Sequence, residues 1–365
     1  MQARPRPGSS GGGRGYHRVI LLSGGDLSAS ISQNWPPFVL VAGLLMIGVV
    51  VERDGVFEAA GAWVERRGGS AAAMLAGLLA MEAVVTAVLN LDTAAVFMTP
   101  ILVHAARQRG CDGSAFLYGA LFMANGASLL LPGSNLTNLI VLAHEPLSGA
   151  QVARSMALPW LAVVALTIAV LVVWFRPSDG HVPRRRAPSL RLGVGLAATA
   201  AATALMLALA NPALPVLAVG LVAIATERIR PRLPLAVLCG LFALATALGV
   251  LAREWDWPAS LLGRHGPALD ACIGAVASVV LNNLPAAALL AAQPPAHPLP
   301  LLIGLNLGPN LLVTGSLSSL LWYRAARSAG AQPSLGRVSA VGVVLVPLTM
   351  AAALLALSAG QRAGL

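Results

Sequence analysis

Long apolar runs separated by short polar stretches fill the chain from Pro36 to Leu357. A helix needs about 20 apolar residues to cross a bilayer, and several runs approach or exceed that length with little or no charge. Other runs are too short to cross. The pattern predicts an all-α membrane protein with about eight transmembrane helices and additional shorter elements.

The short runs come in two pairs, and each pair meets at a polar tip. The tips read Asn90-Leu91-Asp92-Thr93 and Asn282-Asn283-Leu284-Pro285. We interpret each pair as a re-entrant hairpin, over about 70–108 and about 267–293. Because an unpaired polar group in hydrocarbon costs several kcal/mol, such tips must face protein or a water-filled cavity. The tips are therefore candidates for a substrate site.

A long run with a polar break in its middle follows each hairpin, over about 115–143 and about 299–323. The first break is Pro132 to Asn138, and the second comprises Pro309-Asn310 and Thr314 to Ser319. We interpret both runs as unwound transmembrane helices. Such helices expose amides of one half and carbonyls of the other, which places partial charges of about half an electron at the break.

An amphipathic stretch precedes each hairpin, and we expect both stretches to lie flat at the membrane surface. The order helix, interfacial helix, hairpin, broken helix, helix therefore occurs twice, as in an internal repeat. We predict the first repeat over 35–176 and the second over 192–365. A basic linker over 177–191 joins them, and the basic tail over 1–34 is expected to be disordered.

Composition supports the membrane assignment, because 57% of the residues are hydrophobic and only 10% are charged, against about 25% charged in soluble domains. The net charge of +10 would suit nucleic acid, but the basic residues, all of them Arg, lie between the apolar runs. Positive-inside sorting explains that distribution better, so we expect a lipid bilayer and no nucleic acid as partner.

Loop charges indicate how the two repeats are oriented. The loops Arg176 to Arg191, Glu227 to Arg232 and Tyr323 to Arg337 carry net positive charge, which places them in the cytoplasm. The loops Ala143 to Ser155 and Arg253 to His265 are neutral, which suits the outer face. This threading opens the first hairpin to the cytoplasm and the second to the outside. We therefore predict inverted repeats in a multi-pass protein of the bacterial inner membrane.

Five stretches in order carry a resemblance to a known superfamily: Val51 to Glu58, Asp92 to Ile101, Ser134 to Ile140, Leu281 to Pro285 and Leu307 to Trp322. From about Trp35 to Leu357 the chain resembles the ion-transporter superfamily, and within it the arsenite-efflux permeases (ArsB type) more than the divalent-anion/sodium symporters, whose tips read Ser-Asn-Thr. It departs from the permeases at the first tip, where Leu91 separates Asn90 from Asp92, and by lacking their first two helices. The resemblance implies arsenite export.

Uncharged side chains at the tips and breaks can ligate a hydroxylated oxyacid or a sodium ion. The predicted substrate-binding residues are Asn90, Thr93, Ser134, Asn135, Thr137, Asn138, Asn282, Asn283, Thr314, Ser316, Ser318 and Ser319. The alternative is that they only cap helices or satisfy backbone groups freed by the breaks.

Two carboxylates are candidates for proton coupling, because an ionisable residue inside a membrane is functional by default. Asp92 lies at a tip, and Glu82 lies in the apolar first arm of the hairpin. Alternatively, Asp92 caps the helix that follows it, and Glu82 pairs with an Arg.

The function predicted from these features is secondary-active export of arsenite or a similar metalloid oxyacid or anion, coupled to protons. A sodium-coupled anion carrier or a sodium/proton antiporter stays open as the alternative. A homodimer and an ATPase subunit are candidate partners. The chain shows neither a Walker-type loop nor a His-Glu-x-x-His motif, so we expect no enzyme activity, no metal and no cofactor.

Overall fold

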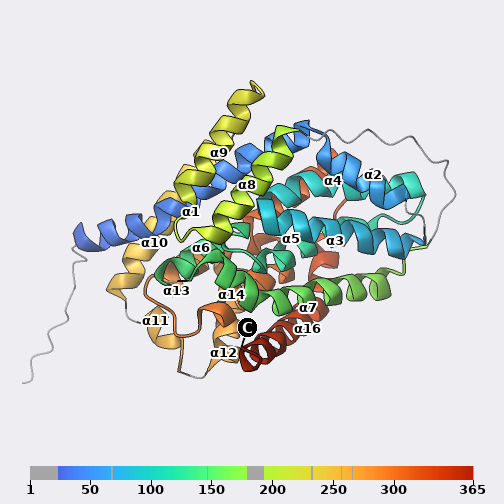
Figure 1. The fold of residues 1–365 in the computed structure, drawn as a ribbon. Helices are drawn as coiled ribbons and strands as arrows, with labels where there is room; N and C mark the ends of the chain where they lie inside the picture. Colours follow the sequence, from blue (N-terminus) through green and yellow to red (C-terminus); the bar gives the residue numbers. More distant parts are fainter. Residues whose placement is uncertain are drawn as a thin grey trace, which may run out of the picture.

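The computed structural model describes residues 24–66, 69–145, 147–178, 193–231, 233–255, 257–264 and 266–364. Residues 1–23 of the expected tail and most of the predicted linker lie outside these ranges. All regular structure in the described part is helical, with short 3-10 segments and no strand (Figure 1). The predicted all-α class is confirmed.

Five described helices are long and apolar enough to cross a membrane. They are α1 (Gly24–Arg53), α3 (Ala71–Leu89), α7 (Gly149–Phe175), α10 (Leu235–Glu254) and α16 (Leu335–Arg362). Three further apolar helices are shorter, α8 (Val194–Ala208), α9 (Ala213–Thr226) and α12 (Pro267–Leu281).

The order of elements repeats as the sequence predicts. In the first copy α1 and α3 flank α2 (Val56–Arg66), and after α3 come α4 (Leu91–Arg109), α5 (Ser114–Gly126), α6 (Leu136–Val141) and α7. In the second copy α10 and α12 flank α11 (Trp257–Leu261), and after α12 come α13 (Asn283–Leu290), α14 (Pro298–Leu307), α15 (Leu317–Ser328) and α16. The closing helices α7 and α16 lie side by side (Figure 1).

Each hairpin turns at an asparagine with an unusual backbone. Asn90, between α3 and α4, has φ 133°, and Asn282, between α12 and α13, has φ 83°. With ψ 169° at Asn90 and 147° at Asn282, both lie outside the left-handed helical region that asparagine tolerates, in backbone that residues other than glycine rarely adopt. Both side chains also cap the helix that follows, Asn90 Oδ1 accepting from the N–H of Thr93 at 2.8 Å and Asn282 Oδ1 from that of Leu284 at 3.4 Å. The two tips are thus built alike.

The two breaks adopt the same local conformation. A one-turn 3-10 segment, η2 (Pro132–Ser134) or η5 (Val313–Gly315), is followed by one extended residue that caps the next α-helix. That residue is Asn135 in the first break, with φ −152°, and Ser316 in the second, with φ −146°. Further 3-10 turns, η1 (Ala127–Leu129) and η4 (Gly308–Leu311), precede them. The helices are unwound where the sequence predicts.

Helix α1 begins at Gly24, so the part of the expected tail from residue 24 onward is helical. Polar side chains in its first turns bind backbone elsewhere. The Ser30 hydroxyl donates to the carbonyl of Thr246 at 2.8 Å, and Gln33 Nε2 donates to that of Ala291 at 2.7 Å. The polar residues here favoured a disordered tail in the sequence. In the structure, Ser30 and Gln33 instead make tertiary hydrogen bonds to α10 and to the end of α13.

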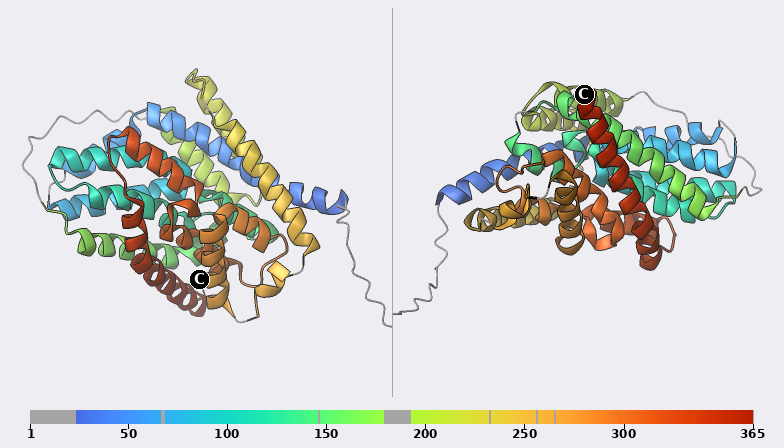
Figure 2. Two further views of the ribbon diagram at one scale, coloured as in Figure 1. Left: turned by 180° about the vertical axis from the view of Figure 1, so that it is seen from behind. Right: turned by 90° about the horizontal axis from the view of Figure 1, so that it is seen from below.

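Helices α8 and α9 pack against α1, so the range predicted as the second repeat opens with two helices that cover the first. Glycines allow this approach, because a Cβ on Gly43 would lie 2.8 Å from backbone atoms of Leu217, and one on Gly220 would lie 2.7 Å from the carbonyl oxygen of Gly43. Small residues at helix crossings are typical of membrane bundles. Helix α10 crosses α1 on its other side (Figure 2).

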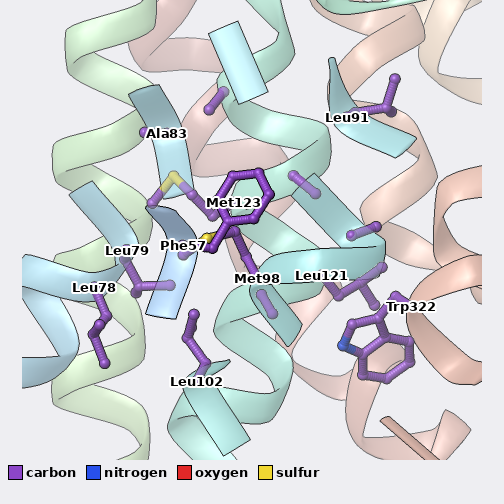
Figure 3. Packing of buried hydrophobic residues seen from close by; sticks show 14 of the residues in the cluster. Phe57, Leu78, Leu79, Ala83, Leu91, Met98, Leu102, Leu121, Met123 and Trp322 are labelled. Carbon is purple, nitrogen blue, oxygen red and sulfur yellow. The ribbon is translucent and has the colours of Figure 1, made fainter. Parts of the chain in front are cut away.

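The larger of two hydrophobic clusters lies where α3, α4 and α5 meet. Figure 3 shows Met98 and Met123 at its centre, with Phe57 of α2 packed nearby and Trp322 of α15 at one side. All four side chains are buried. This cluster ties the first hairpin to α15 of the second copy, so the two copies share a core.

Inversion of the repeats predicts opposite accessibility for two exposed positions, Arg154 on α7 and Ser328 at the end of α15. In a chain with its cysteines replaced by serine, Arg154→Cys is expected to react with an impermeant thiol reagent added outside intact cells. Ser328→Cys is expected to react only after the cells are opened. Gly149 is a poor probe site, because its Cβ would lie 1.9 Å from the carbonyl oxygen of Met206. The reverse labelling pattern would contradict the orientation.

Candidate substrate site

One pocket is lined by both hairpin tips and both breaks. The space between its walls is about 320 Å³, a volume that includes open solvent. Its walls are Leu91, Asp92, Asn135, Leu136, Leu241, Asn282, Asn283, Leu284, Ser316, Leu317 and Ser318. Segments far apart in the sequence therefore converge, as the hairpin-and-break pattern predicts.

The second break is held by an asparagine from the first broken helix. Asn125 Oδ1 accepts from the hydroxyls of Ser316 and Ser318, both at 3.1 Å. Its Nδ2 donates to Oδ1 of Asn310 at 2.9 Å, and Asn310 Nδ2 donates to the carbonyl of Phe122 at 3.3 Å. These polar side chains are buried.

The first break is held in the same way by an asparagine from the second broken helix. Asn306 Oδ1 accepts from Asn135 Nδ2 at 2.5 Å and from the Ser128 hydroxyl at 2.8 Å. Its Nδ2 donates to Asn138 Oδ1 at 2.8 Å and to the carbonyl of Leu302 at 2.9 Å. Each broken helix thus supplies the amide that fixes the other's break, and Asn125 precedes Asn135 by the same interval as Asn306 precedes Ser316.

At the first tip, Asp92 and Asn90 have different roles. Asp92 is half-buried and lines the pocket, and its carboxylate makes no hydrogen bond or ion pair with another described residue. Asn90 accepts from the N–H of Thr93 and so supplies the cap. The cap assigned to Asp92 as its alternative role is therefore provided by its neighbour.

At the second tip, Asn282 and Asn283 both line the pocket. Asn282 Nδ2 donates to the carbonyl of Thr314 at 3.0 Å, which ties the tip to the second break. The Asn283 side chain is buried and has no hydrogen-bond partner among the described residues. Its amide is therefore available to a ligand.

Several predicted site residues do not line the pocket. Ser134 and Asn138 both donate to the carbonyls of Ser128 and Leu131, which is the backbone-satisfying role considered for them. Ser319 is buried against Ser316, with 2.7 Å between their hydroxyls. The others outside the lining are Asn90, Thr93, Thr137 and Thr314.

Glu82 is fully buried in α3, and neither carboxylate oxygen has a hydrogen-bond partner among the described residues. The expected alternative, pairing with an arginine, is not seen in that part of the chain. The hydroxyl of Thr86, one turn further along α3, is also buried without a partner. Glu82 does not line the pocket, so its predicted coupling role would act at a distance from the tip.

Sequence interpretation missed Asn125, Ser128 and Asn306, which organise the breaks. The signal available for them was weak, because each is a single polar residue in an apolar run. Asn310 belonged to the predicted break, but its partner on α5 could not be inferred. The described residues contain no group of three or more His, Cys, Asp or Glu side chains that could hold a metal ion. The site offers amides, hydroxyls and one carboxylate.

Comparison with known proteins places this site in a family context. A model of the citrate transporter family matches residues 19–308. The arsenical pump membrane proteins of Yersinia enterocolitica and Escherichia coli are each 28% identical over 166 residues, which is 43% of this chain and 39% of theirs. An uncharacterized transporter of Mycobacterium tuberculosis is 27% identical over 161 residues, 44% of this chain and 37% of its own. The alignments span about two fifths of these relatives.

Among solved structures, the fold is similar to the YdaH transporter of Alcanivorax borkumensis, described as having an unusual topology. The TM-score is 0.57, and the match covers 93% of this chain and 87% of that one. Sequence identity is 14%, so the likeness concerns the fold alone.

Proposed function

The chain belongs to the citrate transporter family, and we propose that it is a secondary transporter. The substrate that we propose is arsenite or a similar metalloid oxyacid, exported across the bacterial inner membrane. Protons are the proposed coupling ions. Both copies of the repeat contribute to one pocket, and alternating access would expose that pocket to each side of the membrane in turn.

The observation that carries the substrate class is the chemistry of the pocket wall. Amides and hydroxyls supply donors and acceptors, and among the described residues no Arg or His lines it. Burying an unpaired charge in an apolar environment is costly. A multiply charged anion such as citrate would therefore lack a compensating cation, whereas arsenous acid is neutral at physiological pH and carries three hydroxyls. The relatives named arsenical pump membrane proteins support testing this substrate first.

Proton coupling is assigned to Asp92, the carboxylate in the pocket wall. A carboxyl group that faces substrate from a hairpin tip can take up a proton on one side of the membrane and release it on the other. Glu82 is a second candidate, because its carboxylate is buried without a partner. Sodium is the rival ion, since hydroxyl, amide and carboxylate oxygens are also the ligands of hard cations.

A homodimer and an ATPase subunit stay proposals about partners. Large apolar side chains are exposed along α9, including Leu214, Leu221 and Val222. Lipid or a second copy of the chain would cover them.

The experiment that tests the proposed function is metalloid resistance of a host that lacks its own efflux system. Expression of the chain is expected to raise the arsenite concentration that the host tolerates and to lower the arsenite it accumulates. The control is Asn283→Ala, which removes the unpartnered amide from the pocket. Unchanged tolerance and accumulation at verified expression in the membrane would contradict arsenite export.

A further inference from the structure

The directions of the buried hydrogen bonds determine which pocket atoms can donate and which can only accept. An asparagine amide can be placed in two orientations, so its orientation must be derived from its partners. Main-chain carbonyls settle it here, because they accept and never donate. Asn310 Nδ2 faces the carbonyl of Phe122, so Asn310 Oδ1 faces Asn125 and requires a donor there.

Asn125 must therefore direct its Nδ2 to Asn310 and its Oδ1 to the second break. The carbonyl of Leu121, 3.4 Å from the same Nδ2, requires the same orientation. Oδ1 of Asn125 accepts only, and it takes hydroxyl hydrogens from Ser316 and Ser318. Ser316 Oγ, 2.9 Å from Ser318 Oγ, is a second acceptor for the Ser318 hydrogen inside the network. Ser316 Oγ also accepts from the N–H of Ser319 at 3.2 Å. Ser318 is left with lone pairs and no hydrogen for a ligand in the pocket.

The opposite wall of the pocket presents a donor hydrogen. Asn138 Nδ2 faces the carbonyls of Ser128 and Leu131, so Asn138 Oδ1 accepts from Asn306 Nδ2. Asn306 Oδ1 must then accept from Asn135 Nδ2. Asn135 Oδ1 is already used by the N–H of Thr137 at 3.0 Å. Asn135 is left with its second amide hydrogen, which it can donate to a ligand.

We propose that Asn125 and Asn306 are positioning residues that give the pocket a fixed hydrogen-bond polarity, with Asn135 as donor on one wall and Ser318 as acceptor on the other. This inference rests on the proposed function for the identity of the ligand, but the derivation of the polarity does not use it. The pocket is complementary to a neutral molecule that both donates and accepts, such as a polyhydroxy acid. Citrate offers a single hydroxyl hydrogen and otherwise only accepts, so it matches the Ser318 acceptor less well than arsenous acid does.

The variant that tests the polarity is Asn125→Leu, which has a similar shape and frees both serine hydroxyls to turn into the pocket. Binding to the detergent-purified full chain is measured by isothermal titration calorimetry with arsenite and with citrate. Asn125→Leu is expected to raise the Kd of arsenite at least tenfold and to lower that of citrate, because the second wall gains donors. If Asn125 served folding alone, its replacement would weaken the binding of both ligands or of neither.

A double-mutant cycle shows whether Asn125 acts through Ser318. Ser318→Ala is expected to raise the Kd of arsenite about as much as Asn125→Leu, and the double variant is expected to be no worse than the more severe single variant. Asn306→Leu combined with Ser318→Ala is the control pair, and its effects are expected to multiply. Multiplying effects for Asn125 with Ser318 would overturn the proposal. If Asn125→Leu does not fold, an unchanged Kd of arsenite in Ser318→Ala would overturn it as well.

The outcomes separate this proposal from the proposed function. If the wild type binds citrate and not arsenite, arsenite export is contradicted, while tighter citrate binding by Asn125→Leu would still support the polarity. If arsenite binds the wild type and Asn125→Leu equally, the polarity is contradicted and the function stands. A wild type that binds neither ligand would contradict both.

Discussion

Replacing Asp92 with asparagine is expected to abolish net export of arsenite driven by a pH gradient, while exchange of arsenite across the membrane continues. Asparagine keeps the shape and hydrogen-bonding capacity of the side chain but cannot carry a proton. Asp92 lines the pocket and makes no other interaction with described residues, so the substitution removes a titrating group without breaking a contact. The cap of α4 is unaffected, because Asn90 provides it.

Everted vesicles provide the measurement for Asp92→Asn. Uptake of radioactive arsenite driven by an imposed pH gradient is expected to fall to the level of empty vesicles. In counterflow, unlabelled arsenite inside the vesicles drives the entry of labelled arsenite. The rate of counterflow is expected to remain within about threefold of the wild-type rate, which corresponds to a free-energy change of less than about 1 kcal/mol. Normal gradient-driven uptake would move the coupling role to Glu82, for which Glu82→Gln is the corresponding variant.

The second large effect is expected for Asn306→Ala, which removes the amide that holds the first break. Asn135 Nδ2, Asn138 Oδ1 and the Ser128 hydroxyl would all lose a partner while buried. A buried polar group left unsatisfied costs about 1–3 kcal/mol, so we expect a loss of about 3 kcal/mol or more in the free energy of unfolding. The orientation of Asn135 in the pocket would be lost with it.

Thr349→Val is the matched control for Asn306→Ala. Thr349 is also buried, but its hydroxyl donates only to carbonyls of its own helix, those of Leu345 and Val346. Its loss is expected to cost less than about 1 kcal/mol. Thermal unfolding of both variants in detergent, followed by tryptophan fluorescence, provides the comparison. Equal stabilities would contradict a holding role for Asn306.

The elements that the sequence predicts well are those where polarity interrupts a long apolar run. The tips at Asn90 and Asn282 and the breaks before Asn135 and Ser316 all stand out in this way, and the structure turns or unwinds the chain at each. Backbone N–H and C=O groups without hydrogen-bond partners are very costly in lipid. A turn or break in a membrane helix therefore needs polar residues nearby, which the local sequence reveals.

Pairing across the molecule was not predictable. Asn125 and Asn306 are single polar residues in apolar runs, and their partners lie on the other broken helix. The start of α1 at Gly24 was missed for the same reason, because Ser30 and Gln33 find their partners in distant segments. The packing of α8 and α9 on α1 depends on glycine contacts that no local pattern reveals.

Equilibrium binding of arsenite to the purified chain tests most directly the central claim, that one substrate pocket is built from both copies of the repeat. The account predicts one site per chain, and at least a tenfold increase in Kd, about 1.4 kcal/mol, for both Asn135→Ala from the first copy and Asn283→Ala from the second. Thr349→Val is expected to bind as the wild type does. Two independent sites per chain, or a loss confined to the variant of one copy, would contradict the account.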